Sequence, residues 1–146
     1  MLQCDELWSF VKSKEQQAWL WSAMDVETRR ILCVHIGGRT KEDAQKLVNK
    51  LHPSFKDVAY VDTDGLASYI EPLEDFDHTM HPDKGSGMLN YIERFHLTLR
   101  HLCARLRRKG LGFSKSWDNH KGAIYAAIKY YNKTFAKSLA GKSFYH

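Results

Sequence analysis

The chain lacks any apolar run long enough to cross a membrane. Charged or polar residues interrupt every apolar stretch well before the roughly 18 residues that a spanning helix needs. The N-terminus, Met-Leu-Gln-Cys-Asp-Glu, has neither the basic nor the apolar segment of a secretory signal. We therefore expect a cytoplasmic protein with no membrane partner.

Cysteine is scarce and unpaired in the sequence. Cys4, Cys33 and Cys103 are far apart and never in a Cys-x-x-Cys arrangement, which argues against a disulfide framework and against a structural zinc site. No cysteine pair accompanies His78 and His81 either, so we interpret the thiols as buried and these two histidines as loop residues. A nucleophile elbow is also missing, which argues against serine or cysteine hydrolase chemistry.

The residues that are present indicate one folded domain with an uneven charge distribution. The 146 residues suffice for one compact core, and 43% of them are hydrophobic. Residues 85–146 contain twelve lysines and arginines against two acids, whereas residues 1–84 contain ten against fifteen. Such a split suits a protein that binds a polyanion with one part and gathers carboxylates around cations with another.

Three segments near the N-terminus are predicted to be strands. They are residues 2–11, 18–24 and 30–37, joined by a polar turn at 12–17 and a hairpin connection at 25–28. Three consecutive strands at this spacing predict an antiparallel meander.

A helix and a fourth strand follow. Thr40 is predicted to cap a helix that ends near Leu51, with Asp43 completing a capping box. Residues 58–65 form a short apolar run that closes on acids and glycine, which is typical of a central strand whose end opens into a site. The helix is predicted to bury one face, made of Ala44, Leu47, Val48 and Leu51.

The C-terminal half is predicted to be helical. Residues 66–70 can form a short helix, and residues 71–87 are polar and are interpreted as a loop. Apolar residues at spacings of three and four then predict an amphipathic helix over 88–109 and a second one over about 116–139. The first apolar stripe is Ile92, Phe95, Leu99, Leu102 and Leu106, and the second is Trp117, Ile124, Ile128, Tyr131 and Phe135.

The order β-β-β-α-β-α-α is that of the α/β RNase H-like fold, a mixed sheet flanked by helices. By analogy with that fold, catalytic acids sit on the first strand, on the strand after the first helix and on a later helix. Asp5, Asp64 and Glu93 occupy these positions. Carboxylates are the ligands that Mg²⁺ and Mn²⁺ prefer, and two such ions about 3.5 to 4 Å apart assist in-line phosphoryl transfer.

Each acid also has an ordinary structural interpretation. Asp5 is next to Glu6, and since only one of two neighbours in a strand faces a given side, either could be the ligand. Asp64 has Asp62 two residues earlier, and Asp-Gly is a common turn former. Glu93 could be a solvated helix residue.

Basic residues are predicted to continue from the acids as a DNA-binding track. Arg100 and Arg107 follow Glu93 at steps of seven, which on a continuous helix would place all three near one stripe. Neutralising phosphates would make binding strongly salt-dependent; a solvated basic helix end is the structural alternative. The predicted DNA-binding residues are Arg100, Arg105, Arg107, Arg108, Lys109 and Lys115.

Several motifs, in order from about residue 3 to residue 132, resemble the transposases of the insertion-element-one family of bacteria and archaea. They are Cys4-Asp5-Glu6-Leu7-Trp8-Ser9-Phe10-Val11, Thr63-Asp64-Gly65, Tyr91-Ile92-Glu93-Arg94-Phe95 with Leu99-Arg100, Ala104-Arg105-Leu106 with Arg108-Lys109, and Phe113-Ser114-Lys115-Ser116.

The resemblance implies a DDE transposase with Asp5, Asp64 and Glu93 as catalytic and metal-binding triad and Arg100 as the basic residue seven positions later. It implies Mg²⁺ or Mn²⁺ as cofactor, hydrolysis at transposon ends, and attack of the freed 3′-hydroxyl on target DNA. Family members carry an upstream DNA-recognition region, so we expect a downstream-frame product that works with an upstream-frame partner or fusion. We also expect a homo-oligomer associated with the nucleoid.

Two alternatives remain open from the sequence. An RNase H-like nuclease or resolvase would cleave without joining strands. A non-catalytic regulator of transposition would bind DNA whether or not the three acids are present.

Overall fold

The computed structural model of the chain describes residues 1–83, 85–107, 112–136 and 138. Five strands form one mixed sheet in the order β3-β2-β1-β4-β5. The strands are β1 (Leu2–Val11), β2 (Ser13–Asp25), β3 (Ile31–Gly37), β4 (Tyr60–Asp64) and β5 (Asp77–His81). The helices are α1 (Lys41–Asn49), α2 (Phe55–Val58), α3 (Asn90–Leu102) and α4 (Trp117–Tyr131), with 3₁₀ turns at Ala67–Tyr69 and Ala104–Leu106 and a π-helical turn at Asn132–Ala136.

The predicted meander is confirmed, because β1 pairs with β2 and β2 with β3, both antiparallel. The predicted polar turn over residues 12–17 is wrong. The chain reverses at Lys12, which has a positive φ of 63°, and β2 begins at Ser13. Residues 13–17 are all exposed because this end of β2 projects into solvent. Its residues are therefore as polar as those of a turn, which is why the sequence suggested one.

The connection from β3 to β4 crosses one face of the sheet. Thr40 caps α1 in a capping box with Asp43, as predicted, and the predicted apolar face of α1 is buried. The short helix α2 was not predicted, and it delays the start of β4 to Tyr60. β4 then runs parallel to β1, with Leu2 opposite Val61.

Residues 71–87 are not all loop, as the sequence suggested. Residues 77–81 form β5, which runs parallel to β4 from Tyr60 opposite Asp77 to Asp64 opposite His81. An edge strand with mostly exposed and half-buried side chains needs no apolar run, so the sequence gives little sign of it. His78 and His81 therefore lie in a strand rather than in a loop.

Both long helices differ from their predicted extents. α3 ends at Leu102 because Cys103 is extended (φ −128°, ψ 105°) and buried, and the predicted helix over 88–109 is thus too long. α4 starts after Ser116, whose side chain accepts from the Asn119 N–H, but the predicted end near residue 139 lies outside the described residues. Trp117 was predicted to be buried and is 40% exposed, because the buried face of α4 begins one turn later, at His120.

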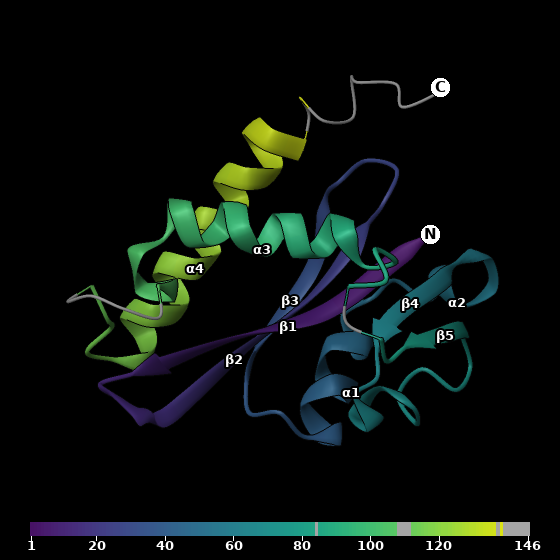
Figure 1. The fold of residues 1–146 in the computed structure, drawn as a ribbon, viewed down its shortest axis with the longest axis horizontal. Helices are drawn as coiled ribbons and strands as arrows, with labels where there is room; N and C mark the ends of the chain where they lie inside the picture. The colour runs from purple at the N-terminus through teal and green to yellow at the C-terminus, as the bar shows by residue number, and fades with distance from the viewer. Residues whose placement is uncertain (84, 108–111, 137, 139–146) are drawn as a thin grey trace.

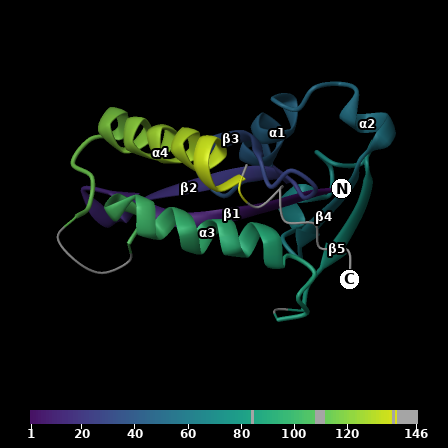
Figure 2. The ribbon, with the colours of Figure 1, turned by 90° about the horizontal axis from the view of Figure 1, so that it is seen from above.

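Two apolar clusters hold helices against the two faces of the sheet. α3 and α4 pack on one face, around Leu7, Leu20 and Phe95, and α1 packs on the other, around Trp21 and Leu47. Figure 1 shows α3 and α4 on one side of β1 and β2 with α1 on the other, and Figure 2 shows the two long helices extending along these strands. Among the described residues, no helix is both long and apolar enough to span a membrane.

Candidate active site

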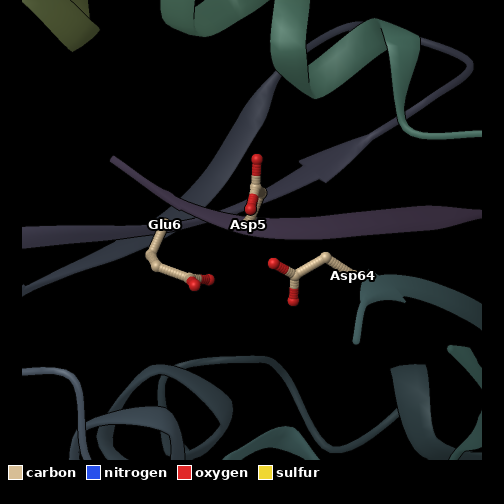
Figure 3. Close-up of side chains that lie close together, drawn as sticks. All are labelled: Asp5, Glu6 and Asp64. Carbon is tan, nitrogen blue, oxygen red and sulfur yellow. The ribbon is translucent and has the colours of Figure 1, made fainter. Parts of the chain in front are cut away.

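Three carboxylates meet where β1 and β4 run side by side. Asp5 and Glu6 lie in the middle of β1, and Asp64 is the last residue of β4. The parallel register, with Gln3 opposite Asp62, brings Asp64 level with Asp5. One ligand oxygen from each of the three residues lies within 4.8 Å of the other two. In Figure 3 Asp5 and Glu6 leave β1 on opposite sides, and the Asp64 carboxylate points between them.

The three carboxylates open onto a cavity of ≈ 560 Å³. Glu93, one turn inside α3, lines the same cavity, as do Arg39 and His81. The segment after β5 closes one side, and Gly65 approaches it so closely that an added Cβ would lie 3.0 Å from Pro82. The fold therefore brings Asp5, Asp64 and Glu93 to one cavity, but the close group of carboxylates is Asp5, Glu6 and Asp64, and Glu93 lines the cavity outside that group.

The environment of the Asp5 carboxyl group is unfavourable for a negative charge. Burial raises the pKa of its carboxyl to about 8, and the charges of Glu6, Asp64 and Glu93 add to this, although the backbone N–H of Glu6 acts in the opposite direction. A bound cation would relieve both the desolvation and the repulsion.

Glu6 differs from Asp5 because its two oxygens already have partners. Oε1 accepts from Arg39 Nε at 3.1 Å and Nη2 at 2.9 Å, and Oε2 accepts from the Tyr69 hydroxyl at 2.9 Å. The Arg39 guanidinium also stacks over the Trp19 ring at 4.5 Å. Burial raises the pKa of Glu6, while Arg39 and Tyr69 oppose the shift. Of the two neighbours, Asp5 is thus the better placed to bind a cation.

The two aspartates of β4 have different partners. Asp64 Oδ1 accepts from the Leu66 N–H at 2.9 Å, which fixes its side chain at the end of the strand. Asp62 Oδ1 lies 2.9 Å from His81 Nε2 and is not part of the three-carboxylate group.

The sequence analysis missed His96, Arg39 and Tyr69. His96 Nδ1 lies 3.5 Å from Asp5 Oδ2, and burial, with the nearby Arg100, lowers the pKa of His96 to about 3. Its position three residues after Glu93 on a helix is a signal that could have identified it. Arg39 and Tyr69 are brought to Glu6 by the tertiary fold, and no local pattern marks them.

The predicted basic track does not form one helical stripe. Arg100 is half-buried on α3, but the helix ends at Leu102, so Arg107 lies beyond it in an extended conformation. Arg105 is half-buried and donates from Nη1 to Ser114 Oγ at 3.2 Å, which indicates a packing role. Arg107 and Lys115 are exposed, and Arg108 and Lys109 lie outside the described residues.

Comparisons with known proteins give one family. The model of the IS1 transposase family matches residues 1–134. The insertion element iso-IS1n protein InsB of Shigella dysenteriae is 35% identical over 127 residues, which cover 87% of this chain and 92% of that protein. InsB of insertion element IS1 4 of Escherichia coli K12 is 36% identical over 132 residues, 88% of this chain and 75% of that protein.

Solved structures with a similar fold include retroviral integrases. A chain of the simian T-cell lymphotropic virus intasome, in complex with PP2A regulatory subunit B56 gamma, has a TM-score of 0.60 at 15% identity and covers 87% of this chain and 46% of that one. The HTLV-2 integrase catalytic core domain in complex with magnesium, in its dimeric form, has a TM-score of 0.55 at 15% identity. The match covers 91% of this chain and 86% of that one. Integrase cores are RNase H-like, so the predicted fold class is confirmed.

Proposed function

The chain belongs to the IS1 transposase family and has the fold of an integrase catalytic core, and on that premise we propose that it is a DDE enzyme whose Asp5, Asp64 and Glu93 hold Mg²⁺ or Mn²⁺. The observation that carries this proposal is the convergence of these three side chains on one cavity, with Asp5 and Asp64 oxygens within 4.8 Å of each other. The substrates are the transposon ends and the target DNA.

The donor set fits such a cofactor. All three side chains offer carboxylate oxygens, which hard divalent cations prefer over nitrogen or sulfur. The raised pKa of Asp5 reflects the burial and crowding that a cation would offset. When bound, the ions would activate an attacking oxygen and stabilise the leaving one during in-line phosphoryl displacement.

Other residues of the chain hold the proposed metal ligands in position. Asp64 is fixed by the Leu66 N–H, and Asp5 is backed by buried His96 on α3. Glu6, tied to Arg39 and Tyr69, anchors the same stretch of β1 against the opposite face and so keeps Asp5 in place. The cavity that would take the 3′-hydroxyl and the phosphate is lined by Glu93 and by the segment after β5 as well as by the two aspartates.

Strand transfer with precut element-end DNA tests the proposal directly. Purified protein, alone and with the upstream-frame product or fusion we expect, is assayed with and without Mn²⁺. The isosteric variants Asp64→Asn and Glu93→Gln are compared with Glu74→Gln, which removes an exposed acid elsewhere. We expect Mn²⁺-dependent joining by the wild type and by Glu74→Gln only.

The other outcomes separate the alternatives. Metal-dependent cleavage without joining would identify a nuclease or resolvase. DNA binding with no chemistry in any form, and no effect of the carboxylate substitutions, would identify a regulator. Light scattering of the protein with DNA tests the expected homo-oligomer.

A further inference from the structure

A hollow lined by cationic side chains lies at the edge of the sheet that is remote from β4 and β5. It is a shallow hollow of ≈ 500 Å³ between the second half of α4 and the start of β3. Because β3 is the opposite edge strand from β5, β2 lies between this edge of the sheet and β1, which carries Asp5 and Glu6. Its lining residues are Arg30, Tyr125, Ile128, Lys129, Asn132 and Lys133.

The hollow is built by a side-chain clamp between α4 and β3. The Asn132 amide nitrogen donates to the Ile31 carbonyl at 3.0 Å, and its oxygen accepts from the Ile31 N–H at 2.8 Å. Ile31 and Ile128 are both buried beneath the clamp. Arg30, the residue before Ile31, is thereby brought beside Lys129 and Lys133.

The charge of the hollow is of one sign. Arg30, Lys129 and Lys133 are exposed, and within the described part of the chain none of them lies within 4.0 Å of a carboxylate oxygen. Of the described residues that line the hollow, none is acidic. Three clustered cations without acidic partners attract a polyanion, and nucleic-acid phosphates are spaced to meet several of them.

Aromatic side chains alternate with the cations along α4. Residues 117, 121, 125 and 129 of α4 are Trp, Lys, Tyr and Lys, and spacing by four makes each the surface neighbour of the next. Lys133 follows four residues later, in the π-helical turn after α4. Lys121 Nζ lies 5.6 Å from the Trp117 ring centre, and Tyr125 is 43% exposed at the wall of the hollow. From Trp117 to Lys129 the row is about 18 Å long at 1.5 Å per residue. Asp118 is the acidic residue in the first turn of α4, so the positive charge of this helix is concentrated toward its other end, at the hollow.

We infer that the hollow binds a DNA strand, with Arg30, Lys129 and Lys133 on backbone phosphates and Tyr125 against an unpaired base. Cations that follow a backbone, combined with aromatic faces on which bases stack, are the means by which proteins hold single strands. The inference rests on the proposed function only in taking DNA as the ligand. It adds a contact surface that is distinct from the cavity of Asp5, Asp64 and Glu93.

Binding is measured in the Asp64→Asn background without divalent metal, so that the result does not depend on catalysis. Fluorescence anisotropy with short labelled single-stranded and duplex DNA compares two triple variants of equal charge. One is Arg30→Gln, Lys129→Gln, Lys133→Gln, and the control is Lys14→Gln, Lys46→Gln, Lys56→Gln, all at exposed positions outside the hollow. Circular dichroism confirms that each variant is folded.

We expect the hollow variant to lose at least tenfold in affinity at low salt, and its plot of log affinity against log salt to flatten by about two to three units, as for two to three lost phosphate contacts. The control should change little. Tyr125→Ala should weaken single-strand binding about tenfold or more. Its matched control, Tyr130→Ala, removes an aromatic ring that is 53% exposed but absent from the hollow, and should have little effect.

Three results would overturn the inference. They are equal losses in both triple variants, which would indicate net charge alone; no loss in the hollow variant; and dissociation of an oligomer by the hollow variant in light scattering without DNA, which would make this face a contact between copies of the chain. None of these results bears on strand transfer, whose failure is seen only in the metal-dependent assay.

Discussion

The Nδ1 atom of His96 lies 3.5 Å from the Oδ2 atom of Asp5, and His96 is buried. With a pKa lowered to about 3, the imidazole is neutral at physiological pH and can point one N–H at the carboxylate. No described residue forms a hydrogen bond with Nε2, so the ring's polar contact is with Asp5. His96 is thus a positioning residue for a carboxylate that we propose to be a metal ligand.

Replacing His96 separates this role from simple packing. Outer-sphere partners of metal ligands are typically worth about 10- to 100-fold in metal affinity. We expect His96→Leu to weaken Mn²⁺ binding about tenfold or more, and His96→Asn, which retains a donor, to restore much of the loss. Calorimetric Mn²⁺ titration measures the affinity, and denaturant unfolding shows whether the fold is intact. Unchanged Mn²⁺ affinity in a folded His96→Leu protein would assign His96 to packing alone.

Tyr69→Phe tests the anchoring role of Glu6. The substitution removes the donor to Glu6 Oε2 while retaining the buried ring that packs edge-on against Trp21. Because the acceptor is a buried carboxylate, we expect a loss of about 1 to 3 kcal/mol in the free energy of unfolding. Tyr60→Phe, at an exposed position, is the matched control and should cost nothing measurable. Equal stabilities of the two variants in urea unfolding would show that the hydroxyl contributes nothing to the anchor.

Local sequence signals accounted for most of the fold. The meander, the capping box at Thr40 and Asp43, and the positions of α3 and α4 follow from periodicity and capping residues, which act over a few neighbours. β5 was missed because an edge strand with half-exposed faces has no apolar pattern. The premature end of α3 at Cys103 was missed because its apolar spacing continues through Leu106, which is buried from a 3₁₀ turn instead.

The sequence indicated which acids line the cavity, but it did not indicate the residues that contact those acids and hold them in position. Asp5, Asp64 and Glu93 line one cavity, as the element order indicated, while their role as metal ligands stays a prediction. The choice between Asp5 and Glu6 required tertiary partners, since Arg39 is 33 residues from Glu6 and Tyr69 is 63 residues away. Likewise, the Asn132 clamp joins residues 101 positions apart.

The buried network around His120 predicts a specific pH dependence of stability. Arg105 donates to Ser114, whose hydroxyl lies 2.7 Å from His120 Nδ1, and Nε2 lies 2.8 Å from Ser9, which donates to the Ala18 carbonyl. This chain of donors fits a neutral ring. Burial, with Arg105, lowers the pKa of His120 below its ordinary value of 6.5.

The unfolded state therefore binds a proton near pH 6.5 that the folded state binds only at lower pH, and stability falls as the pH drops below that value. We expect His120→Gln to reduce the slope of the free energy of unfolding against pH. The reduction should be at most that of one bound proton, about 1.4 kcal/mol per pH unit. The exposed His52→Gln is the control. Urea unfolding across the acidic range provides the slopes. Identical slopes for wild type and His120→Gln would mean that the ring is protonated equally in both states.

The raised pKa of Asp5 sets the pH dependence of metal binding. A pKa of about 8 means that the metal-free carboxyl is mostly protonated at neutral pH, and a cation must displace that proton to bind. Affinity for Mn²⁺ should therefore rise about tenfold per pH unit as the pH approaches 8 from below, and level off above it. In calorimetry below that pH, buffers of different ionisation enthalpy should report the release of about one proton per binding event. Asp5→Asn should abolish both the tight binding and the proton release, and Glu74→Gln should preserve them. Mn²⁺ binding without proton release at neutral pH would show that Asp5 is already ionised or is not a ligand.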